Sequence, residues 1–438
     1  MVALVAGPAS GAEPALADVG PGPTMGRSGP SSPDPARAKP VSLAELLAYA
    51  DDHSPQLVIA RSTRGVADAA RVAASPLLPA NPELAAGVGP RYGIFGVGVD
   101  ADVSLSQRLY IAGERGRRRD AAKRFGELTD AAIEQARWAV HCDIHAAFQR
   151  ALVLHERALL AERVLAFQEN VLRVVQGQVK AGNVPPLMLR LAEAEVAQAK
   201  QSLLAAQQAL LVSRIQLAQL SGWPAANPPE PRGGLVPPED PPPYPELVAT
   251  ARSNLPVLRT REAAVREADA RVKVARREVW PQPSIGVQYR HEGNPTTEGP
   301  YNIVLGTLAF TIPSFQTNQG ERALARARAG VARAEQAATL TLLDAQIAEA
   351  HSAVVAAAKR VRSYGSEILP RFEENLGLLR RSFELGEIDM LSLLIGRERF
   401  LKIQSDALDT YVDYFVALAN LERTVGVDFA VDRRTGGK

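Results

Sequence analysis

Apolar residues recur every three or four positions over two very long stretches of this chain. From about Glu114 to Lys180 and from Gln319 to Glu384, this spacing predicts two helical rods. Each would measure roughly 100 Å at 1.5 Å per residue. Pro370 is expected to kink the second rod. In the first rod, the positions expected to face a neighbouring helix are Ile144, Ala147, Ala151, Leu154, Ala158, Ala161 and Leu165.

The same order of elements occurs twice, about two hundred residues apart. Each rod ends in a glycine-centred turn, at Gly182 and at Gly386, and a returning helix follows. A shorter helix precedes each rod, from about Leu43 to Ser75 with a capping box begun by Ser42, and from about Glu246 to Val279. Placed end to end, the shorter and the returning helix match the rod in length. Each half therefore predicts one long helical column beside two short ones.

Two segments in each half alternate apolar and polar residues with a period of two. In the first half they are Leu84 to Val88 and Val97 to Ser106, and in the second half Ile285 to Arg290 and Tyr301 to Ile312. This period predicts one β-hairpin per half, with one apolar and one polar face. A two-stranded ribbon is marginal alone, so the hairpins need partners. The fold class that we expect is mainly α with a small β part, built as long helical hairpins in a tandem repeat plus two β-hairpins.

Composition divides the chain into five parts. Met1 to Ala12 resembles the end of a secretory apolar segment without its positively charged start. The stretch up to Pro40 contains no cysteine, so we expect no lipid attachment there. The segment that joins the halves is rich in proline, which favours an extended path over a packed loop. We expect a signal remnant and disordered tail at 1–40, the first structural repeat at 41–222, a Pro-rich linker at 223–245, the second repeat at 246–428 and a disordered C-terminal tail at 429–438.

Charge and motifs argue against nucleic-acid binding and against catalysis. The formal net charge is +2 and aromatic residues make up 5% of the chain, which offers neither a strong basic field nor a stacking surface. The basic run Arg115 to Arg119 opens a helix and is followed by acidic residues, so we expect it to face solvent or lipid headgroups. The sequence shows no phosphate-binding glycine loop and no nucleophile motif. We expect no enzyme, no cofactor and no nucleic-acid partner.

His141 and His145 stand one helical turn apart with Cys142 beside them. Such a pair can form half of a metal site, but no carboxylate motif nearby completes one. We favour solvent-facing or seam histidines over a metal role. Cys142 is the only cysteine, so it allows neither an intramolecular disulfide nor a multi-cysteine zinc site.

Asp100 and Asp102 are the acidic residues that the strand pattern places on one face. If the apolar set faces lipid, both carboxylates point into a lumen, where a ring of copies would favour cations. An ordinary polar strand face explains the same pattern equally well. We keep both interpretations and mark the two residues as candidate pore-lining positions.

The paired glycine turns, the duplicated order of helix, hairpin and helix, and the endings Leu217 to Gly222 and Leu421 to Gly426 resemble the TolC-like outer-membrane efflux family. The resemblance covers about Val41 to Asp428 and is greatest to members that serve cobalt-zinc-cadmium-type resistance pumps. It implies a homotrimer in the outer membrane of a Gram-negative bacterium, with a twelve-stranded β-barrel continued by an α-helical tunnel through the periplasm. It also implies a passive exit duct for heavy-metal cations, working with a periplasmic adaptor and an inner-membrane pump.

By the same resemblance, the two helix–turn–helix tips contact the adaptor and close the tunnel. A purely structural cap remains the alternative for these turns. Where some members carry gating aspartates, this chain has Ser392 and Ile395, which makes an aspartate ring there doubtful. The tip residues that correspond are Gly182, Asn183, Val184 and Leu187 in the first copy, and Gly386, Glu387, Ile388 and Leu391 in the second.

Other functional classes remain open at this stage. A soluble coiled-coil scaffold would keep the helices but leave the hairpins without a lipid-facing role. A periplasmic adaptor would carry one helical hairpin and additional β-rich domains, whereas this chain predicts two hairpins of long helices. An outer-membrane duct could instead conduct drugs or type I secreted polypeptides, because the predicted lumen residues do not select a substrate.

Overall fold

The computed structural model of the protein describes residues 40–93, 96–182, 184–293, 301–385 and 387–429, with the backbone alone at 380, 383, 384, 390 and 391. Asn183, Gly386 and nearly all of both predicted tails lie outside these residues. The described elements are α1 Leu43–His53, α2 Pro55–Ala73, β1 Glu83–Gly93, β2 Gly96–Arg108, α3 Glu114–Lys180, α4 Pro186–Ser221, α5 Tyr244–Asn254, α6 Pro256–Arg277, β3 Ser284–Glu292, β4 Tyr301–Ala309, α7 Gln319–Ser363, the π-helical turn η1 Tyr364–Ile368, α8 Leu369–Glu384 and α9 Met390–Val425.

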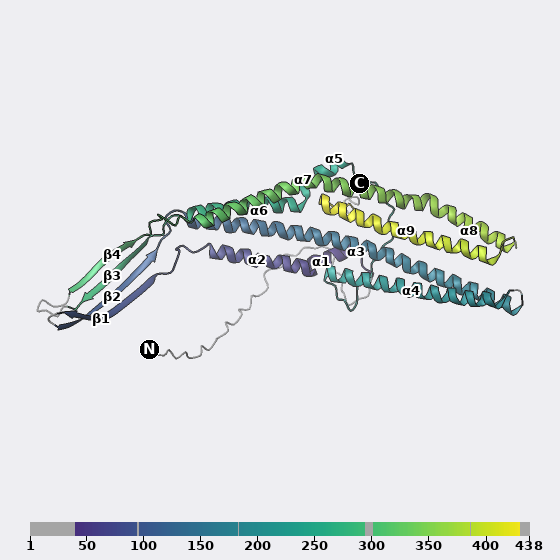
Figure 1. Ribbon diagram of the computed structural model, residues 1–438, viewed down its shortest axis with the longest axis horizontal. Coiled ribbons are helices and arrows are strands. Elements are labelled where there is room, and N and C mark those ends of the chain that lie inside the picture. Colours follow the sequence, from purple (N-terminus) through teal and green to yellow (C-terminus); the bar gives the residue numbers. More distant parts are fainter. Residues whose placement is uncertain (1–39, 94–95, 183, 294–300, 386, 430–438) are drawn as a thin grey trace. The chain divides into compact units, whose positions relative to one another are not determined.

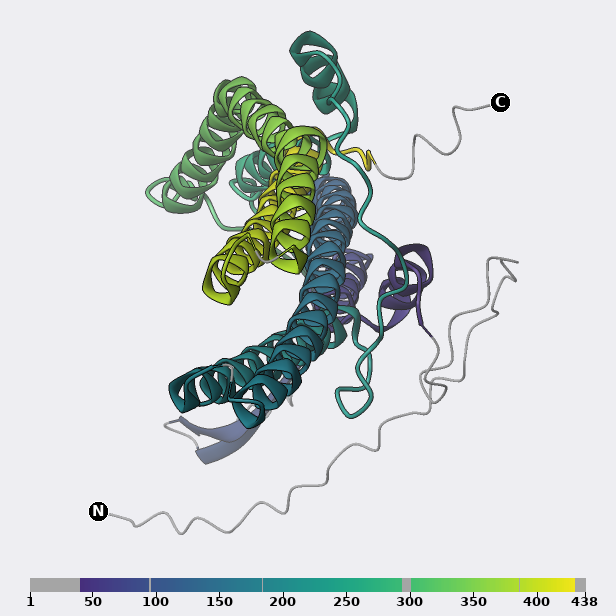
Figure 2. The same ribbon diagram turned by 90° about the vertical axis from the view of Figure 1, so that its right-hand side faces the viewer.

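The helices of each repeat form the predicted column arrangement. In the first repeat, α2 and α4 follow one another along the 67-residue α3, which begins and ends where the sequence predicts (Figure 1). In the second repeat, α6 and α9 lie along the column formed by α7, η1 and α8. Seen from the end that carries the helix–helix turns, α3 with α4 and α8 with α9 lie side by side as two hairpins (Figure 2).

The prediction of one uninterrupted short helix before each rod is wrong. The first is divided at Ser54 between α1 and α2, and the second at Leu255 between α5 and α6. In both, a proline is the first residue of the following helix and pushes its predecessor into an extended backbone, with ψ of 124° at Ser54 and 116° at Leu255. The capping box of Ser42 and Glu45 is confirmed.

The irregularity expected at Pro370 takes the form of a π-helical turn, η1, directly before it. Proline cannot donate a backbone hydrogen bond, and its ring collides with the carbonyl one turn earlier in a regular α-helix. One π-helical turn avoids this collision, and the helical column then continues as α8.

The two predicted β-hairpins join into one antiparallel sheet in the order β1-β2-β3-β4. The junction is the pairing of β2 with β3, which runs from Ala101 opposite His291 to Arg108 opposite Ser284. Each hairpin thus pairs with the other through one of its strands. Within the described residues, β1 and β4 each keep one unpaired edge.

Two apolar clusters lie where the shorter helices meet the middle of the long ones. In the first repeat, Leu46, Ile144 and Leu217 are fully buried, and in the second Leu247 and Ile347 are. Burying such a side chain contributes about 1.5–3 kcal/mol. Of the predicted seam positions, Ile144, Ala151 and Ala158 are buried, and the other four are half-buried.

The Pro-rich linker is extended, but the expectation that it would not pack is wrong. Trp223 is buried in the core of the first repeat. Arg214 donates hydrogen bonds to the carbonyl oxygens of Pro228 and Pro229, and Arg362 donates to that of Pro238. A chain that forms neither helix nor strand leaves its carbonyls unpaired, and arginines from both repeats satisfy them here.

One glycine in each repeat closes the junction between the helical columns. Gly222 and Gly426 end α4 and α9 with φ of 77° and 83°, a left-handed conformation that glycine adopts without strain. A Cβ on Gly222 would lie 2.0 Å from the carbonyl oxygen of His53, and one on Gly426 would lie 2.8 Å from the Cα of Leu255. Both contacts fall at the break between the two short helices of the repeat.

We therefore expect Gly222→Ala to lower the melting temperature of the purified protein. The left-handed backbone alone costs roughly 1–2 kcal/mol for alanine, and the collision with His53 adds to it. Gly177→Ala is the matched control, because Gly177 lies within α3 with open space around it. There alanine should stabilise by about 0.5–1 kcal/mol. Equal melting temperatures for the two variants would contradict this account.

Candidate functional site

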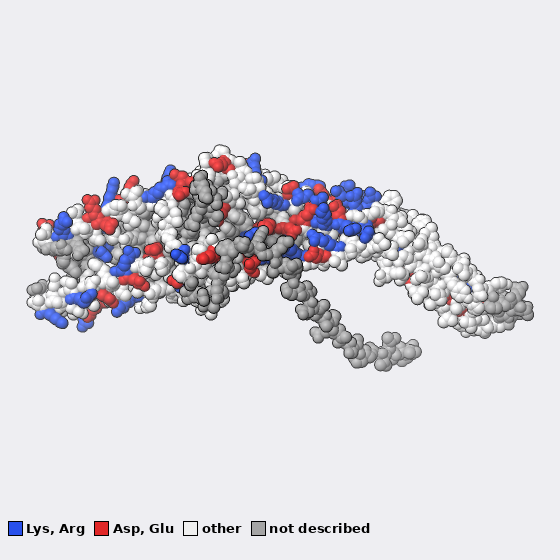
Figure 3. All heavy atoms as spheres, turned by 180° about the vertical axis from the view of Figure 1, so that it is seen from behind, with Lys and Arg blue, Asp and Glu red and all other residues white. Residues whose placement is uncertain are grey.

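One face of the sheet is apolar and exposed across all four strands. The antiparallel register places Leu84 opposite Leu105, Val103 opposite Tyr289, and Ile285 opposite Leu308 on this face. Figure 3 shows few charged atoms over the strands, whereas Lys, Arg, Asp and Glu cover the helices. The exposed large apolar residues of this face are Leu84, Val88, Tyr92, Val97, Val99, Val103, Leu105, Ile285, Val287, Tyr289, Val304 and Leu308.

The opposite face of β1, β2 and β3 is polar and rich in glycine. Arg91 binds both carboxylate oxygens of Asp100 at 3.0 Å and Glu292 at 3.2 Å. Asp100 also accepts a hydrogen bond from the backbone N–H of Gly293 at 3.0 Å. The β4 strand departs from this pattern, because Tyr301 and Leu305 make its polar-side positions apolar as well.

Asp100 and Asp102 therefore share the polar face, as the sequence pattern predicts, but differ in their surroundings. Asp100 is engaged by Arg91, so its charge is largely compensated. Asp102 stands opposite Gly87 and Arg290 in the register, and its side chain occupies the space that the missing Cβ of Gly87 leaves open. Their role as pore-lining residues stays a prediction.

The tip of the first repeat is a short turn between α3 and α4. Gly182 has φ of 75°, and its N–H donates to the carbonyl of Val179 at 3.0 Å. Pro186 begins α4, Val184 is half-buried and Leu187 is 66% exposed.

The tip of the second repeat is capped at both helix ends. The N–H of Glu387 donates to the carbonyl of Ser382 at 2.9 Å, which is the bond of a helix ending in a reversed turn. The carboxylate of Asp389 accepts from the N–H of Ser392 and caps α9. Glu387 is exposed, Ile388 is half-buried, and Leu385, which the sequence did not single out, is 70% exposed. Both tips lie at the end of the helices remote from the sheet (Figure 1).

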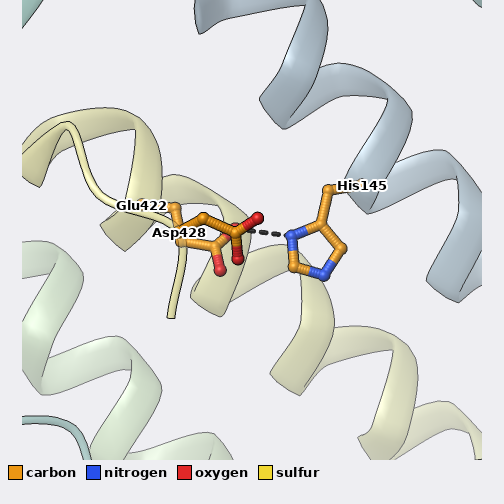
Figure 4. Close-up of side chains that lie close together, drawn as sticks. All are labelled: His145, Glu422 and Asp428. Atoms are coloured by element: carbon orange, nitrogen blue, oxygen red, sulfur yellow. Dashed lines mark hydrogen bonds and ion pairs between the residues drawn. The ribbon is translucent and has the colours of Figure 1, made fainter. Parts of the chain in front are cut away.

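The two histidines of α3 each meet a carboxylate from the second repeat, which the residues near them in the sequence do not indicate. Nδ1 of His145 lies 2.7 Å from Oε2 of Glu422, and Nε2 of His141 lies 2.9 Å from Oδ2 of Asp428. His145, Glu422 and Asp428 converge from α3, α9 and the segment after α9 (Figure 4). Neither histidine is a free surface group, since both belong to the seam between α3 and α9.

This cluster is deeply buried at its centre. The side chain of His145 is 2% exposed and that of Glu422 is 0% exposed. Burial is the largest single influence and lowers the pKa of His145. The hydrogen bond to Glu422 and the negative charges of Glu422 and Asp428 together outweigh it, so the pKa lies above its ordinary value. Burial, helped by the negative charge of Glu422, raises the pKa of the Cys142 thiol to about 12, so that thiol stays protonated.

Sequence reasoning missed Glu422 because 277 positions separate it from His145. One signal was available. Glu422 lies between the apolar seam positions Leu421 and Val425 of α9, where a charged residue is unusual unless it is paired.

Comparison with known proteins identifies the family. A profile described as "Outer membrane efflux protein" matches residues 53–223 and again residues 247–427. The chain belongs to this family. The two matched segments correspond to the two structural repeats, each with its helices, its hairpin and its tip.

Individual relatives agree with this assignment. The chain is 24% identical over 320 residues to the cobalt-zinc-cadmium resistance protein CzcC of Cupriavidus metallidurans, covering 73% of this chain and 75% of that protein. The CmeC outer membrane channel of Campylobacter jejuni has a similar fold, with a TM-score of 0.71 at 14% identity over 90% of this chain and 89% of that one. A membrane protein from Pseudomonas aeruginosa gives 0.69 at 19% identity over 89% and 92%.

Membership of this family confirms the resemblance seen in the sequence, the fold class and the prediction that the protein is not an enzyme. It also confirms an efflux channel at the level of the family, against a soluble scaffold or an adaptor. Among the described residues, the helices are too short or too polar to cross a membrane.

Proposed function

We propose that this protein is the exit duct of an efflux system in the outer membrane of a Gram-negative bacterium, extending into the periplasm. Substrate, which we infer to be heavy-metal cations, passes through it passively after delivery by a periplasmic adaptor and an inner-membrane pump. The observation that carries the proposal is the sheet, which exposes an apolar face on every strand and has a polar opposite face on β1, β2 and β3. Such a sheet is stable in lipid when its polar face lines water.

Three copies would join their sheets edge to edge and their helices side by side. The unpaired edges of β1 and β4 would otherwise leave backbone N–H and C=O groups without partners in lipid. The helices support the same association, because they keep large apolar side chains exposed. On α2 these are Val58, Ile59, Val66 and Val72, and on α7 they are Leu324, Val331, Leu340 and Leu342.

The membrane placement predicts that a charge is tolerated on the polar face of the sheet but not on the apolar face. Val103→Arg puts a charge on the apolar face of β2, which costs about 2–4 kcal/mol at the middle of a bilayer. Ser104→Arg is the matched control, since the neighbouring residue lies on the polar face of the same strand. We expect Val103→Arg to reduce the amount of protein recovered in the outer-membrane fraction, with little loss for Ser104→Arg. Equal recovery of both variants would count against the proposal.

The helical tips are the proposed adaptor contact. The exposed side chain of Leu187 supports a role in binding a partner. The residues proposed for this contact are Gly182, Asn183, Val184, Leu187, Gly386, Glu387, Ile388 and Leu391. Replacing Gly182 and Gly386 by leucine should leave the trimer intact but abolish cross-linking to the adaptor, because leucine is strained at the φ of 75° found at Gly182. Gly177→Leu, on the exposed surface of α3, is the control. Normal cross-linking in the double variant would remove this assignment.

The metal substrate rests on the similarity to CzcC, a cobalt-zinc-cadmium resistance protein, and on the carboxylate of Asp102 on the polar face of the strands. Deleting the gene should increase sensitivity to cobalt, zinc or cadmium in growth assays, and the intact gene should restore resistance. Asp102→Asn tests whether the carboxylate on the strand contributes. Unchanged metal tolerance together with sensitivity to toxic organic compounds would favour a drug duct, and loss of a secreted polypeptide would favour a secretion duct.

A further inference from the structure

The cluster at the α3–α9 seam has the composition of a metal site. Nδ1 of His145, a carboxylate oxygen of Glu422 and one of Asp428 all lie within 4.8 Å of one another. A tetrahedral cation with bonds of about 2.0–2.2 Å holds its ligand atoms about 3.4 Å apart. The 2.7 Å contact between His145 and Glu422 must therefore open by about 0.7 Å to admit such an ion.

Each of the three side chains is also held from its far side. The backbone N–H of Phe429 donates to Oε1 of Glu422 at 3.2 Å, and Nε2 of His141 binds Oδ2 of Asp428 at 2.9 Å. Groups that orient the ligands in this way are a regular feature of metal sites, because they fix the tautomer and direction of each ligand.

Gln149 provides the third such group and an independent indication. Its Nε2 lies 3.4 Å from Nε2 of His145, while its buried Oε1 has no hydrogen-bond partner among the described residues. Rotating this amide by 180° brings Oε1 against Nε2 of His145, which then donates its proton to Gln149. In that arrangement the proton on Nδ1 is the one donated to Glu422, and a cation that replaces this proton is bound by Nδ1 while Gln149 holds the N–H of Nε2.

We propose that His145, Glu422 and Asp428 bind a divalent cation of the Zn²⁺ type, with His141 and Gln149 as positioning residues. Binding breaks the hydrogen bond between His145 and Glu422 and releases the proton that they share to solvent. Two carboxylates balance the charge of the ion in this buried place. Among the described residues, the ligand atoms that converge here are those of His145, Glu422 and Asp428, and Cys142 is not one of this group.

The surroundings leave room for one further ligand. A cavity of about 650 Å³ lies beside the cluster, and His145, Gln149 and Phe429 are part of its wall. Three protein ligands with a water molecule on the cavity side complete four-coordination. The linker around Arg232 and Gly233 forms another wall of this cavity.

The site would tie the two repeats together. His145 belongs to the first repeat, whereas Glu422 and Asp428 belong to the end of the second. The two repeats differ here, because the position of Glu422 in α9 corresponds to the buried Ala218 in α4. The inference does not depend on which substrate the protein conducts.

Metal binding by the full-length chain tests the proposal. The protein is purified in detergent without a polyhistidine tag, stripped with EDTA and titrated with Zn²⁺ alone, or with Co²⁺ as a spectroscopic probe. We expect one bound ion per chain, a visible Co²⁺ spectrum of low coordination number and a higher melting temperature with Zn²⁺. Asp428→Asn should weaken binding by at least about tenfold, and Gln149→Leu should weaken it by about 10–100-fold.

Matched controls separate this site from other histidines and from loss of fold. His351→Ala, on α7, and Cys142→Ser should keep full affinity. Asp428 is only partly buried, so its isosteric asparagine variant should fold, which the metal-free melting temperature checks. Absence of stoichiometric binding, or unchanged affinity in Asp428→Asn, would overturn the proposal and leave the cluster as a buried ion pair alone.

Discussion

The seam of α3 is the constraint on which the rest of the structure depends. A helix of 67 residues satisfies its own backbone, but it carries an apolar stripe far longer than any single neighbour of ordinary length can cover. Several helices together cover this apolar stripe. α2 and α4 cover α3 from within its own repeat, and α6 and α9 cover it from the other. Association of the two repeats is therefore a consequence of the length of α3.

The sheet and the middle of the helical part differ in where their apolar side chains lie. In the middle of the helical part, apolar side chains are buried around Ile144 and Ile347, whereas the large apolar side chains of the strands are exposed. The charged network of Arg91, Asp100 and Glu292 lies on the other face. In water such a sheet would expose more apolar surface than a stable monomer tolerates. The proposed placement of the strands in the outer membrane would account for this arrangement, because an outward apolar face is favourable in lipid.

In the middle of the helical part, the two repeats have nearly the same structure but differ at one buried position. Gly222 and Gly426 close the column junctions in the same way in both repeats. At the buried position four residues earlier, the first repeat has Ala218 and the second has Glu422. The alanine lets helices approach closely, while the glutamate binds His145 across the seam. A buried carboxylate is costly without such a partner, so this difference gives the α3–α9 contact a specific register.

The sequence alone determined the elements and their order. Periods of 3.6 and 2 residues are local properties, so the bounds of α3, the strand segments and the glycine turns could be predicted from them. The divisions between α1 and α2 and between α5 and α6 also have a local cause, namely Pro55 and Pro256. They were missed because the apolar period of about 3.6 residues continues across them. Only the tertiary structure decided that the two hairpins form one sheet, that the linker packs, and that His145 meets Glu422. These contacts join residues far apart in the chain, and their register depends on how whole helices and strands lie against one another, which no local pattern records.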